Sequence, residues 1–372
     1  MKIAFFVHDY HRHGGHCRYV AELASRFKRD HEVHIFANRW EEPDPAHLTF
    51  HHVPAWTWRE LTKVFSFILP ATLMAPKGFD IVHSQGLCGL RHNITTTHFN
   101  QAAWFRETGK RGIPVGAIGW FWKYFVAPME KYALGPSCSQ HVISISKGVE
   151  EDLVKEYGIT KNIHRVYHGV DLDRFHPSQK DNWRVGIRQE IGLTNETFLA
   201  LFVGNLKKGA AVAIKAVAMV PGIHLALVSG SKNTYEKKLV QQLSICDRIH
   251  WVPMTKAVEK YFSAADCFVF PTVYEPFGMV ISEAMASGLP VITSRSAGAS
   301  DLITHGRDGY LLDEPWDEIG IAKYLMDLKA DPANAKAMGV AARKAIEPYT
   351  WDRCAQETMK VYQMVLAEKL SD

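Results

Sequence analysis

The sequence predicts an α/β fold with two doubly wound domains of parallel strands, and three observations predict it. The chain has 372 residues, too many for one core of ordinary size but well matched to two domains. Of these residues 47% are apolar and 22% are charged, a composition typical of folded globular proteins. Short apolar runs recur between longer amphipathic segments along the whole chain.

The apolar runs are expected to be buried strands. In the first half they are Ile3–Val7, Glu32–Phe36, Ile81–Ser84, Asn93–His98, His141–Ser146 and Ile163–His168. In the second half they are Phe198–Val203, His224–Ser229, Arg248–Val252, Cys267–Pro271 and Val291–Ser294. Strands that are apolar on both faces and alternate with helical patterns indicate parallel sheets covered by helices. The segment from Gly169 to Glu196 interrupts this rhythm, so we expect the domain boundary near it.

Composition excludes several classes of protein. The apolar run that starts the chain ends at His8, which is too short for a signal-peptide core or a membrane span, so we expect a strand there. The six cysteines form no CxxC pair, and neither a disulfide framework nor a zinc cage is expected. A reducing cytoplasm is therefore the expected location.

Positive charge is concentrated in the first half of the chain. Residues 1–170 carry 20 Lys and Arg against 15 Asp and Glu, whereas the remaining residues carry 23 against 24. The same half holds 15 of the 19 histidines, which become cationic beside anions or at mildly acidic pH. We expect an anionic ligand or surface near this half. The absence of long Lys/Arg runs argues against a nucleic-acid partner.

The strongest signal of function is the segment EPFGMVISEAMASGLPV, residues 275–291, which directly follows a predicted strand. Gly278 allows a close turn into a helix whose first amide groups can hold a phosphate, and Gly288 ends that helix. Glu275 and Glu283, with seven residues between them, can each accept two hydrogen bonds from adjacent hydroxyls of a sugar or ribose. Two solvated glutamates near a helix start explain the spacing equally well.

This segment resembles the EX7E signature of glycosyltransferase family 4, the retaining family with the GT-B fold. Further motifs resemble the same family in order and spacing. They are GGHCRYVAELA at 14–24, KGFDIVH at 77–83, TTTH at 95–98, SISK at 144–147, HGVDLDRF at 168–175 and FVGNLKKG at 202–209. The resemblance implies two Rossmann-like domains that face a central cleft. It divides the chain into an acceptor-side domain at 1–170 plus the returning helix in 351–372, and a nucleotide-binding domain at 171–350.

The resemblance also implies the donor site. In the family the first glutamate contacts the donor sugar and the second contacts the ribose, while an arginine and a lysine after another strand bind the pyrophosphate. Asn205 stands where that arginine is usual, and Lys207 can replace its charge but not its two-pronged geometry. The implied donor residues are Gly15, Asn205, Lys207, Lys208, Glu275, Gly278, Met279, Val280 and Glu283.

His98 is the implied catalytic histidine, beside Glu275 and Lys208. It ends a predicted strand, and its expected role is to hydrogen-bond the sugar and favour the charge that develops as the glycosidic bond breaks. A packed or solvated histidine is the alternative. A metal is not expected, because the spacing of the histidines in HDYHRHGGH, residues 8–16, fits no ligand set, and Asp171-Leu172-Asp173 resembles a structural turn of the family. His8, His11, His13 and Arg12 are expected to face an anionic acceptor.

The segment Trp104–Tyr132 mixes aromatic and basic residues, among them Trp120, Tyr124 and Arg111. This composition is typical of peripheral contact with an anionic membrane, and equally of a helix beside an acceptor site. The sequence as a whole predicts a retaining glycosyltransferase that uses a nucleotide sugar and a cell-envelope glycan or glycolipid acceptor. A sugar-nucleotide epimerase and a non-catalytic sugar-nucleotide binder are the alternatives.

Overall fold

The computed structural model describes residues 1–12, 14–42, 44–58, 60–74, 77–110, 112 and 116–371. The chain divides into two compact units. The first unit comprises Met1–Gly169 and Trp351–Asp372, and the second comprises Val170–Thr350. The first residues after Gly169 therefore already belong to the second unit, which includes the polar segment where we expected the boundary.

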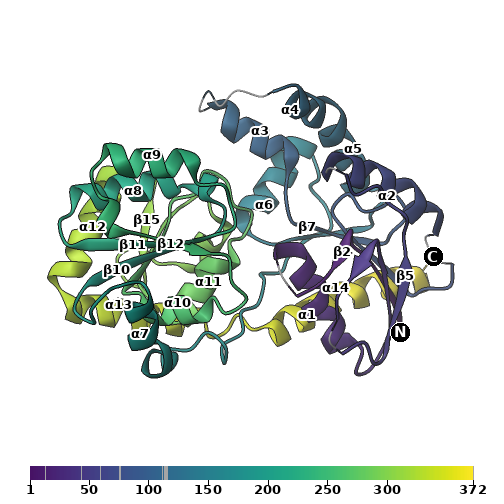
Figure 1. The fold of residues 1–372 in the computed structure, drawn as a ribbon. Helices are drawn as coiled ribbons and strands as arrows, with labels where there is room; N and C mark the ends of the chain where they lie inside the picture. The colour runs from purple at the N-terminus through teal and green to yellow at the C-terminus, as the bar shows by residue number, and fades with distance from the viewer. Residues whose placement is uncertain are drawn as a thin grey trace. The chain divides into compact units, whose positions relative to one another are not determined.

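The first unit is built on a parallel sheet (Figure 1). Its strands are β1 (Lys2–Phe6), β3 (Glu32–Ala37), β5 (Leu48–His52), β6 (Ile81–Gln85), β7 (Ile94–Thr97), β8 (His141–Ser144) and β9 (Ile163–Arg165). Within the described residues their order is β5-β3-β1-β6-β7-β8-β9. The chain thus winds outward from β1 in both directions, and the reversal between β1 and β6 is the point where such sheets bind ligands. Two short strands, β2 (Asp9–Tyr10) and β4 (Arg39–Trp40), pair separately.

Helices cover this sheet. They are α1 (Gly15–Phe27), α2 (Glu60–Met74), α3 (Gln101–Lys110), α4 (Ala117–Phe121), α5 (Ala127–Leu134), α6 (Lys147–Asp152), α14 (Trp351–Ser371) and the π-helices η1 (Trp122–Val126) and η2 (Leu153–Tyr157). Strands β6, β7 and β8 are buried along their whole length, because both faces of the sheet are covered.

The terminal helix α14 belongs to the first unit and is joined to its sheet by a buried hydrogen-bond chain. The Tyr362 hydroxyl lies 2.7 Å from His83 Nδ1, and His83 Nε2 lies 2.7 Å from Thr96 Oγ1. On the surface, Arg26 Nε donates to Asp352 Oδ1 at 2.6 Å and connects α1 with α14. Residues that are far apart in the sequence therefore pack together in one core.

The second unit repeats the same plan (Figure 1). Its strands are β10 (Phe198–Val203), β11 (Ile223–Ser229), β12 (Ile249–Pro253), β13 (Cys267–Phe270), β14 (Val291–Ser294) and β15 (Tyr310–Leu312). Its helices are α7 (Gln179–Glu190), α8 (Ala210–Met219), α9 (Thr234–Gln242), α10 (Glu259–Ala264), α11 (Met279–Ala286), α12 (Glu318–Ala330), α13 (Pro332–Ile346) and the 3₁₀ helices η3 (Leu206–Lys208), η4 (Cys246–Arg248) and η5 (Gly298–Leu302). The sheet order is β12-β11-β10-β13-β14-β15 in the described chain, all parallel.

The predicted fold class is confirmed, and the predicted strands are all present with ends that differ by a few residues. Two strands of the main sheets were not predicted. β5 is a half-buried edge strand whose sequence, LTFHH, has no apolar run, and β15 has three residues. No helix in the described part of the chain is both long and apolar enough to span a membrane.

Candidate active site

In the second unit, the predicted donor residues gather where the winding of the sheet reverses. Strands β10 and β13 are neighbours in the sheet although two other strands separate them in sequence. The loop after β10 carries Asn205, Lys207 and Lys208, and the loop after β13 carries Glu275. Because parallel strands end at the same edge, both loops lie at the reversal point, where doubly wound sheets bind their ligands.

Lys208 and Glu275 form an ion pair across these two loops. The backbone of Glu275 is fixed independently of that pair. Its N–H donates to the Ser296 carbonyl at 3.2 Å, and its carbonyl accepts from the Gly298 N–H at 2.8 Å. The Glu275 side chain is 14% exposed and that of Lys208 is 43% exposed. The carboxylate is therefore held in place, while the ammonium lies closer to solvent and can approach an anion.

Two glycines make this close approach of the loops possible. Gly209 has φ of +107°, and a Cβ there would lie 2.1 Å from the Pro271 carbonyl oxygen. Gly278 has φ of +92°, and a Cβ there would lie 3.1 Å from Cγ of Glu275. Both backbone conformations disfavour L side chains. A larger residue at Gly209 would push the two loops apart, and one at Gly278 would crowd Glu275 within its own loop.

Helix α11 begins immediately after Gly278 with no side chain that caps its first amide groups. Its first two residues, Met279 and Val280, are partly exposed and lie at the positive end of the helix dipole. Glu283 lies further along the helix and is buried, at 6% exposure. The predicted turn at Gly278 and the helix start after it are therefore present, and phosphate binding there stays a prediction.

Asn205 differs in role from the arginine it replaces. Its side-chain oxygen accepts from the Lys207 backbone N–H at 3.0 Å and caps η3. Lys207 is exposed. The amide of Asn205 thus shapes the loop that presents Lys208, and the positive charge beside it comes from the two lysines.

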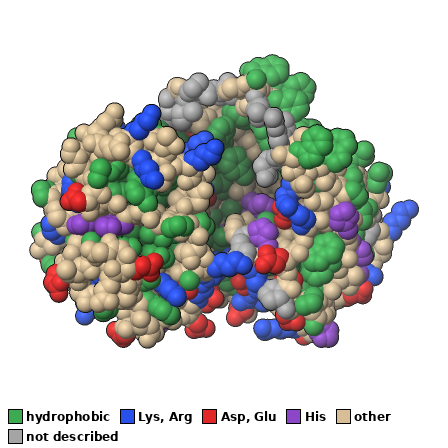
Figure 2. All heavy atoms as spheres, viewed as in Figure 1, with side chains coloured by type: hydrophobic (Ala, Val, Ile, Leu, Met, Phe, Trp, Pro, Cys, Tyr) green, Lys and Arg blue, Asp and Glu red, His purple; other side chains and the backbone are tan. Residues whose placement is uncertain are grey.

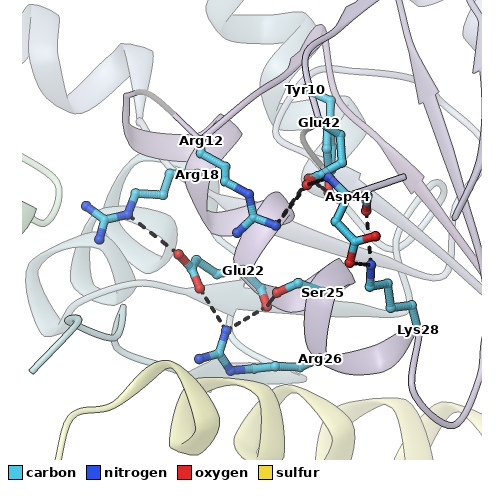
Figure 3. Close-up of polar contacts among 9 residues, drawn as sticks. All are labelled: Tyr10, Arg12, Arg18, Glu22, Ser25, Arg26, Lys28, Glu42 and Asp44. Atoms are coloured by element: carbon cyan, nitrogen blue, oxygen red, sulfur yellow. Dashed lines mark hydrogen bonds and ion pairs between the residues drawn. The ribbon is translucent and has the colours of Figure 1, made fainter. Parts of the chain in front are cut away.

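In the first unit, the glycine-rich segment leads from β1 into α1. Gly14 has φ of +83°, and a Cβ added at Gly15 would meet nothing within 4 Å. The arginines of this segment are paired, as Figure 3 shows: Arg12 Nη2 lies 3.1 Å from Glu42 Oε1, and Arg18 Nε lies 3.8 Å from Glu22 Oε1. The guanidinium of Arg12 therefore already has an anionic partner.

The histidines of the segment 8–16 begin with His8, which is partly buried. The ring of His8 packs on Phe67 at 4.8 Å, and its Nδ1 lies 3.2 Å from Cys88 Sγ. Burial lowers the pKa of His8 to about 3. His13 and Arg111 lie outside the described residues. Among the residues that the structure describes, no group of three or more His, Cys, Asp or Glu is placed to hold a metal ion.

His98 follows β7 and lies against the first turns of α1. Its ring centroid is 4.9 Å from that of Tyr19 and 5.9 Å from that of His16. Its Nε2 lies 2.8 Å from Oε1 of Gln85, the last residue of β6. Gln85 was not among the predicted site residues. Its position at a strand end next to that of His98 was the available signal, because β6 and β7 are neighbours in the sheet.

Comparisons with known proteins identify the family of this chain. The family model described as Glycosyltransferase Family 4 matches residues 13–174, and the model described as Glycosyl transferases group 1 matches residues 185–345. The chain belongs to glycosyltransferase family 4. The two matched stretches of this family 4 chain correspond closely to its two sheets.

Individual curated relatives match only part of this chain. The family 4 chain is 35% identical over 229 residues to the D-inositol 3-phosphate glycosyltransferase of Pseudarthrobacter chlorophenolicus, with 57% of this chain and 52% of that protein covered. The chain spans between half and two thirds of the length of the curated relatives it matches.

Solved structures with the same fold cover almost the whole chain. WaaG, a glycosyltransferase involved in lipopolysaccharide biosynthesis, has a TM-score of 0.79 at 20% identity, with 95% of this chain and 98% of that one covered. Anabaena HepE in complex with UDP-glucose has a TM-score of 0.71 at 19% identity, with 100% of this chain and 99% of that one covered.

Proposed function

We propose that this chain is a glycosyltransferase that moves a sugar from a nucleoside diphosphate sugar to a hydroxyl group. The observation that carries the proposal is the meeting of Lys208, Glu275 and the uncapped start of α11 at the reversal point of one sheet. An ammonium and free helix amides neutralise a pyrophosphate. A buried carboxylate beside them accepts hydrogen bonds from adjacent sugar hydroxyls.

The proposed roles on the donor side follow from this geometry and from family membership. Glu275 binds hydroxyls of the donor sugar, and Glu283 binds the ribose. Lys208 neutralises the pyrophosphate, with Lys207 beside it and Asn205 holding their loop. The amide groups of α11 hold the distal phosphate. The binding of UDP-glucose by a protein of the same fold supports a nucleotide-sugar donor.

The proposed reaction retains the anomeric configuration and needs no metal. The bond from the anomeric carbon to the phosphate oxygen breaks, and a bond to the acceptor oxygen forms on the same face of the sugar. The acceptor proton passes to the leaving phosphate. Positive charge from Lys208 and the α11 dipole stabilises the leaving group, and activity is therefore expected to persist in the presence of a chelator.

The proposed acceptor is a cell-envelope glycan or glycolipid, met at the inner face of the cytoplasmic membrane. An aromatic surface supports membrane contact: Trp120, Tyr124 and Phe125 are 54%, 52% and 49% exposed. Their rings are in contact, with Trp120 4.8 Å from Tyr124 and 6.0 Å from Phe125. Lys123 Nζ lies 5.4 Å from the Tyr124 ring centre. Figure 2 shows hydrophobic side chains gathered over α4.

The test of the function begins with thermal unfolding in the presence of UDP, GDP and ADP sugars, because a ligand that binds only the folded chain raises its apparent stability. The stabilising donor is then incubated with envelope glycolipid, with and without chelator. Sugar transfer in both conditions supports the proposal. Conversion of the nucleotide sugar alone would identify an epimerase, and binding without turnover would identify a non-catalytic binder. Activity restored only by a divalent cation would contradict the metal-free reaction.

A further inference from the structure

Gln85 and His98 form a hydrogen-bonded pair whose polarity can be deduced. The amide oxygen of Gln85 lies 2.8 Å from His98 Nε2. A carbonyl oxygen only accepts hydrogen bonds, so the proton between the two groups is on Nε2. In a neutral imidazole the other nitrogen, Nδ1, then has no proton and is a hydrogen-bond acceptor.

The surroundings of His98 keep its ring neutral. From α1, His16 and Tyr19 face it, and from the segment after β9, His168 faces it at 5.5 Å between ring centres. His83 of β6 adds a further imidazole in the same region. Burial and these neighbouring histidines hold the pKa of His98 well below its usual value of 6.5. A second proton on Nδ1 is therefore disfavoured.

The two remaining nitrogen atoms of the pair have no hydrogen-bond partner among the described residues. Nδ1 of His98 and Nε2 of Gln85 are buried and make no hydrogen bond to any described residue. The whole Gln85 side chain is 4% exposed. Buried polar groups in native proteins are nearly always satisfied, so one free acceptor and one free donor, joined by a shared hydrogen bond, indicate a ligand that supplies the complementary groups.

We propose that Gln85 is a positioning residue that holds His98 in the Nε2–H form, so that Nδ1 accepts a hydrogen bond from a substrate hydroxyl while the Gln85 amide donates to another oxygen of the substrate. This assignment of the ligand as a polyhydroxyl sugar rests on the proposed function. The bare lone pair of Nδ1 also favours positive charge that develops on a sugar as its glycosidic bond breaks.

The tautomer is tested directly by nitrogen NMR of the ¹⁵N-histidine protein, with the His98 signals identified by their absence from the spectrum of His98→Gln. We expect a protonated Nε2 and an unprotonated Nδ1 in the wild type, and a mixture of both forms in Gln85→Met. A proton on Nδ1 in the wild type, which the opposite orientation of the amide would produce, would overturn the proposal.

Turnover tests the positioning role. Gln85→Met is expected to lower kcat about tenfold, the effect of losing one buried hydrogen bond, with a smaller change in KM. Gln85→Glu keeps an acceptor for Nε2–H and should restore most of kcat, and it should move the acidic limb of the pH profile upward because a carboxylate favours imidazolium. Ser84→Ala, which alters the neighbouring residue of β6, is the matched control and should leave both quantities unchanged.

Equal losses in Gln85→Met and Gln85→Glu, with an unmoved pH profile, would mean that Gln85 only packs, and would overturn the proposal. A wild type that transfers no sugar but shows the expected tautomer would instead overturn the proposed function and leave the tautomer assignment intact. The two failures are therefore distinguishable, because the NMR experiment requires no substrate.

Discussion

The ion pair between Lys208 and Glu275 is the residue-scale feature on which the proposed chemistry depends most. It joins the loops that follow two neighbouring strands, and the backbone of Glu275 is held by hydrogen bonds to Ser296 and Gly298. A charged hydrogen bond in a partly buried site contributes more than a neutral one. A substitution that removes the charge of Glu275 but keeps the shape of its side chain measures the contribution of the charge alone.

We predict that Glu275→Gln lowers kcat/KM for the nucleotide sugar on the order of a hundredfold, as loss of one preorganised charged contact does in other enzymes. The amide has the shape of the carboxylate but carries no charge to pair with Lys208, and it has one acceptor oxygen in place of two. Steady-state kinetics with the donor found by thermal unfolding measures the change. Glu314→Gln, at an exposed position of the same unit, should be neutral, and an unchanged Glu275→Gln would refute the assigned role.

Gly209 carries a second residue-scale prediction. A Cβ there would lie 2.1 Å from the Pro271 carbonyl oxygen, at φ of +107°. We expect Gly209→Ala to destabilise the second unit by about 2 kcal/mol or more, since strain and displacement of the loop add. Denaturant unfolding measures the loss, and donor binding should weaken with it.

The matched control is Gly186→Ala in α7. Nothing lies within 4 Å of a Cβ at that position and its φ is not positive, so alanine should stabilise the helix by up to about 1 kcal/mol. If Gly209→Ala lowers the stability and Gly186→Ala raises it, the backbone geometry at each position is the cause, and not a general effect of replacing glycine by alanine. Destabilisation by both would contradict the explanation from loop contact.

At the scale of elements, α14 is attached to the first unit by a buried polar chain as well as by apolar packing. Tyr362 is fully buried, and its hydroxyl is the link to His83. We predict that Tyr362→Phe destabilises the first unit by about 1–3 kcal/mol, the cost of leaving a buried partner unpaired. Urea unfolding measures it. Tyr235→Phe, at an exposed tyrosine of α9, should cost almost nothing, and an equal effect of both would exclude the hydrogen bond as the cause.

The aromatic surface on α4 and η1 carries the prediction about membranes. We expect the combined change Trp120→Ser, Tyr124→Ser and Phe125→Ser to abolish sedimentation with vesicles that contain phosphatidylglycerol, because interfacial aromatic rings supply most of the apolar contact. Secondary structure and thermal stability should be almost unchanged, since all three side chains are about half exposed. Equal vesicle binding by wild type and variant would assign this surface to another role.

Elements were predictable from sequence where burial leaves an apolar signature. β10 and β14 have the bounds that their apolar runs predicted, whereas β5, an edge strand with one partly exposed face, left no such signature. The returning helix that was expected within residues 351–372 runs from Trp351 to Ser371. Its attachment to β6 through His83 was not predictable, because residues 279 positions apart in sequence form that contact.

On the scale of the whole molecule, the same difference separates the donor-side residues of the second unit from the pair of Gln85 and His98 in the first unit. Glu275 and Gly278 lie in one continuous motif, so local sequence predicted the turn that holds them. The pair of Gln85 and His98 depends on the register between β6 and β7, in which Gln85 lies opposite Thr96. Register is a property of the folded sheet, and no local pattern contains it.

Buried ionisable groups give the first unit a predicted sensitivity to acid. Burial lowers the pKa of His83 and His168 to about 3 and that of His92 to about 4, from 6.5. Between those values the unfolded chain binds protons that the folded chain does not, so stability falls as pH falls below about 6.5. Burial raises the pKa of Glu130 from 4.5 to about 7. Between these values the folded chain binds a proton that the unfolded chain does not, which opposes the effect of the histidines. This opposing contribution is lost as the pH rises through 7.

The three histidines against Glu130 contribute up to about two protons of difference, or about 3 kcal/mol of lost stability per pH unit at the steepest point, and His8 and His16, whose pKa values burial also lowers, add to this loss. All of these groups lie in the first unit. Hydrogen exchange in urea, measured by mass spectrometry at about pH 7 and about pH 5, should therefore show the first unit losing more protection than the second on acidification. His83→Gln removes one of these titrating rings and should reduce the slope by about 1.4 kcal/mol per pH unit. A stability of the first unit that does not change across this range would show that its buried histidines are protonated in the folded state, because only then would the folded and unfolded chains bind equal numbers of protons.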